Sequence, residues 1–355
     1  MEQTIHRILI VRNDRIGDVI LTLPIAQVLR NYFPSAHIAM LIQRYTAEVV
    51  EDSRFIDQIV FYDDGQRPVP MFHLISIMRR ERFDIVFHMR PRFRLALMTW
   101  IARIPVRVGT GYRWYSFLFN NKVYEHRKDA QFHELEYNLH LLRAIGIDVP
   151  EGSVKPSLSV RQESVDVVKR LLAESGMSGN ETLVILHPGS GRSARDWSAE
   201  KFGELGRKLC QLPGVTILVI GGRGEETLVA RIQTMIGSGS QAWVDRLTLR
   251  EYAALAKQAK LFVANSTGPI HIAAAVGTPV IGLYPQVTAL SAKRWAPYSE
   301  RKTIFSPVGK PIDCQQCLSQ NSSVCECMES ISVDEVYAAA RRFLHENDFI
   351  KANDY

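Results

Sequence analysis

The residues best suited to chemistry lie where an apolar run meets an alanine-rich segment in the second half of the chain. The apolar run 261–264 indicates a buried strand, and Ser266, Thr267 and Gly268 precede a predicted helix that contains Ala273–Ala275. The glycine allows close approach of the backbone, the two hydroxyls can donate, and the helix start offers free N–H groups with partial positive charge. This pattern predicts a diphosphate-binding site, but it does not identify a reaction.

His271 lies one turn into the same predicted helix. A single histidine in a helix is usually structural, but beside a diphosphate it can donate a hydrogen bond or carry positive charge. The sequence leaves both roles open and favours the phosphate contact.

A second loop with hydrogen-bond donors follows the predicted strand 183–186. Ser190 offers a hydroxyl, Gly191 permits close backbone approach, and Arg192 or Arg195 offers positive charge to a phosphate. A glycine-rich turn with solvated arginines is the alternative interpretation.

An acidic residue, Glu225, follows Gly221 and Gly222 at the end of the next predicted strand. Acidic residues in this position commonly accept hydrogen bonds from ribose hydroxyls. The alternative is that Glu225 only places negative charge at the start of a helix.

Asp18 is the candidate catalytic group in the first half of the chain. A predicted strand, 7–11, runs into the turn 12–18 and a helix that begins near Val19. The turn is not GxGxxG, so the fingerprint of a nicotinamide cofactor is absent and a dehydrogenase is disfavoured. An aspartate kept ionised at a helix start can take a proton from an attacking hydroxyl, and capping the helix is its alternative role.

Four cysteines close together, Cys314, Cys317, Cys325 and Cys327, form the remaining cluster. They could bind zinc or iron, remain free thiols or form a disulfide. The tight CxC and the lack of a second CxxC make a metal the weaker interpretation, and free thiols are favoured. No DxD-type metal motif occurs in a convincing setting, so stabilisation of a leaving diphosphate by cations and helix starts fits better.

Length and composition limit the class of protein. The chain has 355 residues, of which 46% are hydrophobic and 23% charged, as expected for two soluble domains. No run of 18 uncharged apolar residues occurs, and the apolar run 8–11 is too short for a signal peptide, so a cytoplasmic location is expected. The net charge of +6 fits an ordinary basic surface or attraction to anionic lipid or a phosphorylated acceptor. Nucleic acid is disfavoured because no recognition motif is present.

Short β-rich runs alternate with amphipathic segments, which predicts an α/β protein with parallel sheets. The expected strands are 7–11, 38–42, 58–61, 84–88, 106–109, 183–186, 215–220, 261–264 and 280–283. The expected helices are 19–32, 45–51, 70–80, 94–102, 133–145, 164–174, 199–212, 225–236, 249–259, 270–276 and 333–345. A break with two prolines and a glycine at 148–156 predicts domains at 1–155 and 156–332 with a cleft between them, and residues 333–355 are expected to return to the first domain.

Three motifs in order resemble the ADP-heptose:lipopolysaccharide heptosyltransferase family, which is glycosyltransferase family 9. They are the opening segment Arg12–Pro24, the segment 187–197, and the segment 265–279. The resemblance covers about residues 7–343 and implies the GT-B fold, in which two Rossmann-like domains bind acceptor and donor respectively. Two positions depart from the family pattern: Arg195 stands where the family usually has lysine, and Ser266 where it often has aspartate. Arginine keeps the positive charge but is not equivalent to lysine, and a hydroxyl at position 266 must do differently whatever the aspartate does in the family.

The resemblance also implies roles for single residues. Asp18 corresponds to the general base, Glu225 to a ribose-binding residue and Leu247 to a residue packing on adenine, although plain core packing is the alternative for Leu247. The diphosphate would be held by Ser190, Gly191, Arg195, Ser266, Thr267, Gly268 and His271. The segment with Glu134 and Asn138 also resembles the family, but no catalytic role follows from it.

The implied function is inverting, metal-independent transfer of heptose from ADP-heptose to the inner core of lipopolysaccharide. No cofactor is implied, and reversible docking on the inner face of the inner membrane is expected because the acceptor is anionic and amphiphilic. A monomer is favoured because the cleft would supply all the parts. The alternatives are a relative that glycosylates a protein or another surface glycan, and a pseudoenzyme that binds nucleotide or glycolipid.

Overall fold

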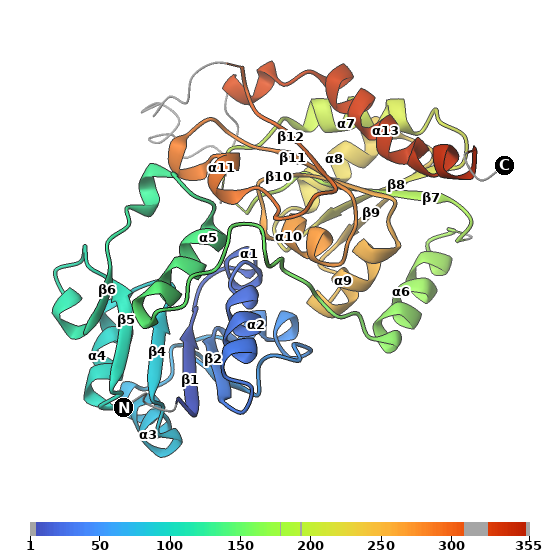
Figure 1. Cartoon of the computed structure of the whole chain (residues 1–355). Helices are drawn as coiled ribbons and strands as arrows, with labels where there is room; N and C mark the ends of the chain where they lie inside the picture. Colours follow the sequence, from blue (N-terminus) through green and yellow to red (C-terminus); the bar gives the residue numbers. More distant parts are fainter. Residues whose placement is uncertain (1–4, 178, 192–193, 309–325, 353–355) are drawn as a thin grey trace. The chain divides into compact units, whose positions relative to one another are not determined.

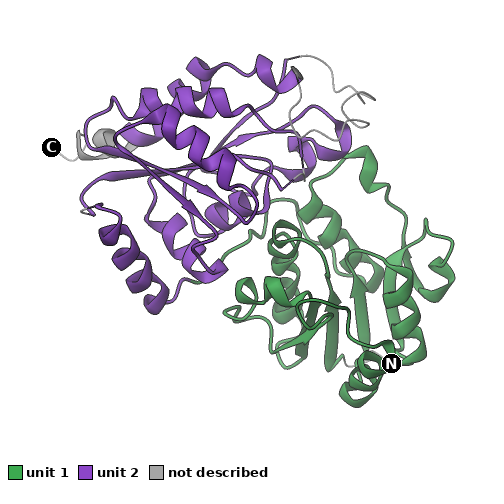
Figure 2. Ribbon diagram, turned by 180° about the vertical axis from the view of Figure 1, so that it is seen from behind, with its two compact units in different colours: residues 1–159 green, residues 160–355 purple. Residues whose placement is uncertain are grey.

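The computed structural model describes residues 5–177, 179–191, 194–308 and 326–352 of the chain. The chain divides into two compact units, residues 1–159 and 160–355 (Figure 2). Cys314, Cys317 and Cys325 lie outside the described residues, as does Arg192. None of the described helices combines the length and the apolar character needed to cross a membrane.

The first unit is built on a parallel sheet with the strand order β3-β2-β1-β4-β5-β6 (Figure 1). The strands are β1 Arg7–Val11, β2 His37–Ile42, β3 Gln58–Phe61, β4 Ile85–His88, β5 Val106–Thr110 and β6 Asn121–Val123. The central strand β1 pairs with β2 on one side and with β4 on the other. Its residues Ile8–Val11 are fully buried, because helices cover both faces of such a sheet.

Helices alternate with these strands. They are α1 Ile16–Ile20, α2 Leu23–Tyr32, α3 Met71–Glu81, α4 Phe93–Ile101 and α5 Glu134–Leu139, with 3₁₀ segments η1 Arg44–Val49, η2 Ser116–Leu118, η3 Arg127–Asp129 and η4 His140–Ile145. Leu74 and Met78 of α3 and Met98 of α4 pack with Leu9 and Val11 in one core. These helices therefore cover one face of the sheet, and Ile8 and Ile10 point to the other face.

The second unit repeats the same architecture, with the strand order β12-β11-β10-β7-β8-β9. The strands are β7 Thr182–His187, β8 Val215–Gly221, β9 Ser240–Val244, β10 Leu261–Asn265, β11 Val280–Leu283 and β12 Lys302–Phe305. The helices are α6 Gln162–Glu174, α7 Ala199–Leu209, α8 Glu226–Ile236, α9 Leu249–Gln258, α10 Gly268–Ala275, α11 Ala292–Trp295 and α13 Val333–Ala352, with η5 Thr288–Leu290 and η6 Glu326–Ser330. Counted within each unit, both sheets have the order 3-2-1-4-5-6, which is that of a doubly wound Rossmann sheet.

The last helix, α13, packs on the second unit. Val336, Ala340 and Phe343 belong to the same buried cluster as Phe202 of α7 and Leu261 of β10. The apolar positions of α13 recur at helical spacing, so one face of the helix joins α7 and α8 over this face of the sheet.

The sequence did not predict three strands, β6, β9 and β12, and each of them is an edge strand. Edge strands are partly solvated and lack the continuous apolar run that marks a central parallel strand. The predicted helix at 133–145 is also two segments, since α5 ends at Leu139 and a 3₁₀ stretch continues to Ile145.

Candidate functional site

Residues that the sequence singled out lie just beyond the carboxyl ends of central strands in both units. In each sheet the strand order reverses at one point, between β1 and β4 in the first unit and between β7 and β10 in the second. Ligands of open α/β sheets bind beyond the carboxyl ends of the strands at such a reversal. Asp18 follows β1, and the predicted phosphate loops follow β7 and β10.

The loop after β10 leads directly into α10. Thr267 is the N-cap residue of α10, with an extended backbone, and its side chain makes no capping hydrogen bond. Gly268 and Pro269 form the start of the helix, where the missing N–H of proline costs nothing. His271 is buried in the first turn of α10, and Ser266 contacts the hydroxyl of Tyr284. The N–H groups at this helix start face the edge of the sheet where a phosphate would bind.

One buried amide side chain joins the loop after β7 to the end of β10. The amide nitrogen of Asn265 donates to the carbonyl of Pro188 at 2.6 Å, and its Oδ1 accepts from the backbone N–H of Trp197 at 2.9 Å. Asn265 is fully buried. It therefore fixes both ends of the loop that carries Ser190 and Arg195, a role that its position in the sequence did not reveal.

Glu225 lies against the glycine-rich turn of the same loop. Its carboxylate accepts from the backbone N–H of Gly222 at 2.8 Å and from that of Gly191 at 3.3 Å. A Cβ atom at Gly189 would lie 1.9 Å from Oε1 of Glu225, so only glycine fits there without moving the carboxylate. The structure thus brings together Gly191 and Glu225, two of the residues predicted to bind the nucleotide-sugar donor.

The residues predicted to bind the nucleotide-sugar donor differ in solvent exposure. Ser190 and Thr267 are buried, Arg195 is half-buried, and Gly191 is exposed with a left-handed φ of 55°. Leu247 is half-buried and precedes the capping box that Thr248 and Glu251 form at the start of α9.

In the first unit, Asp18 belongs to a buried ion cluster centred on Arg12. Arg12 contacts Asp18 through Nη2, Asp14 through Nε at 2.7 Å, and Glu134 through Nη1 at 3.1 Å. The Arg12 side chain is only 2% exposed and that of Asp18 is 15% exposed. Asp18 lies in the first turn of α1 but does not occupy its N-cap position, which is Arg15. The capping alternative for Asp18 is therefore wrong.

This environment changes the titration of the candidate base. The pKa of Asp18 is raised to about 6: burial is the largest cause, the negative charges of Asp14 and Glu134 add to the rise, and Arg12 opposes it. Burial alone would lower the pKa of Arg12, but its three carboxylate partners raise the pKa above its ordinary value. Asp18 is therefore ionised at neutral pH, yet basic enough to accept a proton.

Glu134 and Asn138 complete the cluster from α5. Both are buried, and Arg127 donates to Glu134 Oε1 at 2.6 Å and to Asn138 Oδ1 at 2.9 Å. Arg12 donates to the same two atoms, at 3.1 Å and 3.4 Å. Their spacing of four residues places both side chains on one face of a helix, but only the tertiary structure shows that this face meets Arg12.

A polar cavity of about 630 Å³ lies at the carboxyl ends of β1, β2, β3 and β4 in the same unit. It is lined by Asn13, Asp14, Arg15, Gln43, Tyr45, Tyr62, Arg90, Arg92, Phe93 and Arg94. The guanidinium groups of Arg15 and Arg92 make no hydrogen bond or ion pair with the described residues. Nη1 of Arg90 lies 3.4 Å from Oδ2 of Asp14, so these two side chains form an ion pair. We call this space the arginine cavity, and its charge suits an anionic ligand.

Of the four clustered cysteines, the structure describes Cys327. Cys327 is half-buried in the second unit, and its three predicted partners fall outside the described residues. Among the residues that the structure describes, no group of three histidine, cysteine or acidic side chains is arranged to hold a metal.

Comparison with known proteins shows what this architecture belongs to. Residues 71–327 match the profile of glycosyltransferase family 9 (heptosyltransferase). Lipopolysaccharide heptosyltransferase 3 of Escherichia coli is 25% identical over 301 residues, which cover 81% of this chain and 85% of that protein.

Two solved structures share the fold over nearly the whole chain. The family 9 glycosyltransferase of Veillonella parvula has a TM-score of 0.81 at 22% identity and covers 98% of this chain and 99% of its own. The Escherichia coli ADP-heptose lipopolysaccharide heptosyltransferase II has a TM-score of 0.79 at 18% identity and covers 96% and 99%. These likenesses confirm the GT-B fold expected from the sequence. The chain therefore belongs to glycosyltransferase family 9, the heptosyltransferases, and is a glycosyltransferase.

Proposed function

We propose that this protein transfers heptose from ADP-heptose to the inner core of lipopolysaccharide, with inversion at the anomeric carbon and without a metal ion. The observation that carries the proposal is Asp18, a carboxylate with a pKa raised to about 6 by burial at the strand-order reversal of the first sheet. Support for the substrates comes from the names of its relatives, a lipopolysaccharide heptosyltransferase and an ADP-heptose-dependent one.

In the proposed reaction Asp18 is the general base. Its carboxylate takes the proton of the acceptor hydroxyl while the hydroxyl oxygen attacks the anomeric carbon of the donor. The bond from that carbon to the diphosphate oxygen breaks, and ADP leaves with its electron pair. Attack from the face opposite the leaving group inverts the configuration. Arg12 keeps the Asp18 side chain in place through their ion pair.

The second unit would bind the donor. Thr267, Gly268, His271, Ser190, Gly191 and Arg195 would hold the diphosphate, Glu225 the ribose and Leu247 the adenine, with Ser266 beside them. A half-buried arginine and the start of the eight-residue helix α10 supply the positive charge that the leaving diphosphate needs. These groups are what favours a metal-independent reaction.

Glycine at position 189 provides a test of the donor site. In Gly189→Ala the new methyl group would displace the Glu225 carboxylate and free the N–H groups of Gly191 and Gly222. We expect the Kd for ADP to rise about tenfold, with little change in the Tm because a flexible carboxylate can move. Isothermal titration calorimetry checks this. Gly222→Ala is the control, since a Cβ there lies 4.0 Å from Glu225; equal ADP affinities of the two variants would contradict the assignment of Glu225.

The first unit would bind the acceptor. Like Asp18, the arginine cavity lies beyond the carboxyl end of β1. The guanidinium groups of Arg15 and Arg92 have no partner among the described residues, so they can pair with anionic groups of the acceptor. The inner core of lipopolysaccharide carries such groups, whereas a neutral glycan would leave these charges unpaired. We further propose that the protein is a monomer and that it acts in the cytoplasm, on the inner face of the inner membrane.

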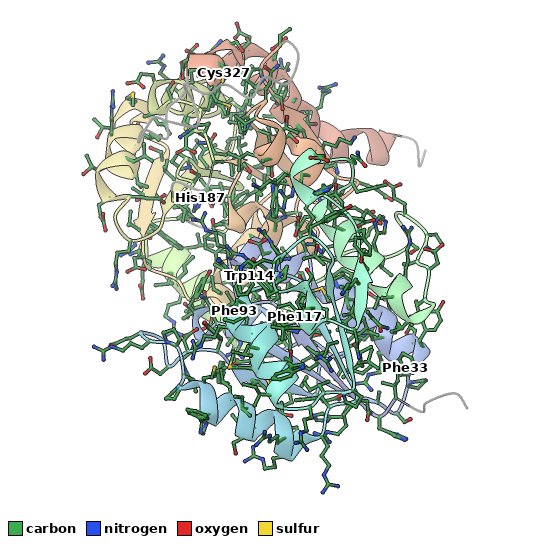
Figure 3. All side chains as sticks on the ribbon, turned by 90° about the vertical axis from the view of Figure 1, so that its left-hand side faces the viewer. Phe33, Phe93, Trp114, Phe117, His187 and Cys327 are labelled. Atoms are coloured by element: carbon green, nitrogen blue, oxygen red, sulfur yellow. The ribbon has the colours of Figure 1, made fainter. Side chains whose placement is uncertain are left out.

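An exposed aromatic group next to this cavity favours docking on a membrane. Phe93 lines the arginine cavity, and its ring centroid lies 4.7 Å from that of Trp114, which is 73% exposed (Figure 3). Phe117 is 69% exposed in the same loop region. Aromatic rings beside basic residues such as Arg92 and Arg113 are typical of surfaces that meet anionic lipid headgroups.

The double variant Trp114→Ser/Phe117→Ser tests this docking surface. We expect about tenfold weaker binding to vesicles that contain phosphatidylglycerol, because the rings no longer enter the headgroup region. Vesicle sedimentation measures the effect. Trp100→Ser is the matched control, since Trp100 is also exposed but lies at the other end of α4. Undiminished binding of the double variant would show that another surface meets the membrane.

The central experiment is glycosyl transfer from ADP-heptose to heptose-deficient lipopolysaccharide, with EDTA present throughout. Turnover under these conditions is the expected result. Binding of ADP without turnover would point to a different sugar or acceptor, such as a protein, or to a pseudoenzyme. Failure to bind ADP would refute the donor assignment, and turnover that EDTA abolishes would refute metal independence.

A further inference from the structure

Helix α5 carries two buried polar side chains to which the proposed reaction assigns no role. Glu134 is 1% exposed and Asn138 is fully buried, and both accept hydrogen bonds from Arg12. A buried carboxylate is costly unless cations pair with it. Glu134 pairs with two, Arg12 and Arg127. A carboxylate shared in this way links each arginine to whatever the other one holds, and Arg12 holds Asp18.

The three nitrogens of the Arg12 guanidinium each face a different carboxylate. Nε faces Asp14, Nη1 faces Glu134 and Nη2 faces Asp18. Because a guanidinium group is planar and rigid, its direction is fixed once two of its nitrogens are held. Asp14 and Glu134 therefore aim the third nitrogen at the carboxylate of Asp18.

Arg127 shares Glu134 with Arg12. Its Nη1 donates to Oε1 of Glu134 at 2.6 Å, whereas Nη1 of Arg12 lies 3.1 Å from the same atom. Nη2 of Arg127 donates to the carbonyl of Tyr137 at 3.2 Å, and Cζ of Arg127 lies 5.7 Å from the centroid of the Tyr137 ring. These contacts hold Arg127 against α5, where its positive charge offsets part of the negative charge of Glu134.

Asn138 holds the backbone that carries Asp18. Its amide nitrogen donates to the carbonyl of Leu21 at 3.2 Å and to the hydroxyl oxygen of Thr22 at 3.3 Å. The Thr22 hydroxyl in turn donates to the backbone carbonyl of Asp18 at 2.8 Å. The same helix α5 therefore fixes the main chain of Asp18 and the guanidinium group that faces its carboxylate.

We propose that Glu134 and Arg127 are positioning residues that set how readily Asp18 accepts a proton. Glu134 aims Arg12 at Asp18 and adds a negative charge close to it, and Arg127 limits the effect of that charge. The two residues therefore have opposite effects: without the charge of Glu134, Asp18 holds a proton less tightly, and without Arg127 it holds one more tightly. The inference rests on the proposed function, because it concerns the same base.

The charged and titratable groups near Asp18 come from the turn after β1, from η1 and from α5. They are Arg12, Asp14, Arg15, Tyr45 and Glu134. The pKa of Tyr45 is raised to about 12, chiefly by burial, so its hydroxyl stays neutral. Burial and the charges of Asp14 and Glu134 raise the pKa of Asp18, and Arg12 opposes the rise. Loss of the Glu134 charge is therefore expected to lower the pKa of Asp18.

Titration of the Asp18 carboxyl group tests the inference without substrate. Protein with ¹³C-labelled aspartate is followed by NMR from pH 4 to pH 8, and Asp18→Asn identifies the signal. The midpoint should move down by about one pH unit in Glu134→Gln and up by roughly 0.5 pH unit in Arg127→Met. Glutamine keeps an acceptor oxygen for both arginines, so the charge alone is removed. Unchanged midpoints, or shifts in the same direction, would overturn the proposal.

Two further variants separate the effect of charge from a loss of structure. Arg127→Lys keeps the cation and should leave the midpoint close to that of the wild type; a shift equal to that of Arg127→Met would contradict the role of the charge. Glu81→Gln is the matched control, because Glu81 also pairs with two arginines, one of which is Arg7 at the opposite end of β1. It should leave the Asp18 titration unchanged. A shift as large as that of Glu134→Gln would show that any carboxylate of the unit has this effect, and the inference would fail.

The inference and the proposed function fail in different ways. The pH range in which kcat/KM for heptose transfer falls should move with the Asp18 midpoint in Glu134→Gln and in Arg127→Met. A shifted titration with an unmoved rate profile, or with no transfer at all, would refute Asp18 as the base of the proposed reaction and leave the positioning role intact. Heptose transfer by a protein whose Asp18 titration does not respond to either variant would refute the positioning role and leave the proposed function intact.

Discussion

Asp18→Asn will inactivate the enzyme and at the same time stabilise it. The amide keeps the shape of the side chain but cannot accept the proton of the acceptor hydroxyl. General-base catalysis contributes about 10²- to 10⁴-fold, and we expect kcat to fall by that amount. The Kd for ADP should stay within about twofold of the wild type, since Asp18 belongs to the first unit and the proposed donor residues to the second.

The gain in stability follows from the direction of the pKa shift. The folded-state pKa of Asp18 is about 6, against a reference value of 3.8, so the folded protein holds this proton more tightly than the unfolded chain. Above pH 6 both states are ionised, and the folded state bears the whole cost of the buried charge, on the order of 2–3 kcal/mol at 1.36 kcal/mol per pKa unit. As the pH falls from 6 towards 4 this cost disappears. The neutral amide of the Asp18→Asn variant never bears this cost, while Asp14 and Glu134 still neutralise Arg12.

Thermal unfolding and the transfer assay measure the two effects together. The Tm of the Asp18→Asn protein at pH 8 should rise by several degrees, and the difference from wild type should shrink towards pH 4. A variant that loses both activity and stability would show that Asp18 has a structural role. An active variant would show that another group is the base.

The same pKa predicts the pH dependence of the wild-type enzyme. The value of kcat/KM should be level above pH 7 and should fall below pH 6, to about one tenth at pH 5, as Asp18 becomes protonated. A rate that stays constant from pH 7.5 to pH 5 would contradict the assignment of the base.

The second large effect is expected for Arg12→Met. This change keeps an unbranched apolar side chain but removes the cation that neutralises Asp14, Asp18 and Glu134 in a buried environment. Removing one partner of a buried ion pair costs about 3–5 kcal/mol, so the Tm should fall by roughly 10 °C. Without its cation, the pKa of Asp18 should rise further and the acid limb of kcat/KM should move to higher pH.

Two variants serve as comparisons for Arg12→Met. Arg12→Lys keeps the charge but cannot reach three carboxylates with one ammonium group, so an intermediate loss of Tm is expected. Arg143→Met removes the exposed ion pair with Asp148, whose side chain is 77% exposed, and should cost less than about 1 kcal/mol. Equal losses for Arg12→Met and Arg143→Met would show that the buried cluster does not stabilise the first unit.

The sequence determined those features of the fold that depend on residues close together along the chain. Central strands such as β1 and β10 are buried on both faces, so their apolar runs were evident, and the turns that follow them carried Asp18 and the hydroxyl residues of the proposed phosphate loop. The parallel α/β fold followed from the alternation of such runs with amphipathic segments. The partly solvated edge strands β6, β9 and β12 carry no comparable signal, and the apolar face of α13 did not indicate which unit it would cover.

Only the tertiary structure decided how distant residues act on the site. Arg12 and Glu134 are 122 positions apart, and Asn265 reaches Pro188 across 77 positions, so no local pattern predicts either contact. The pKa of Asp18 depends on burial and on charges from two different segments, because a short range of sequence does not fix the surrounding dielectric or the direction of distant side chains. The sequence by itself determined which groups of this protein can do chemistry, and the fold decided their charge and their partners.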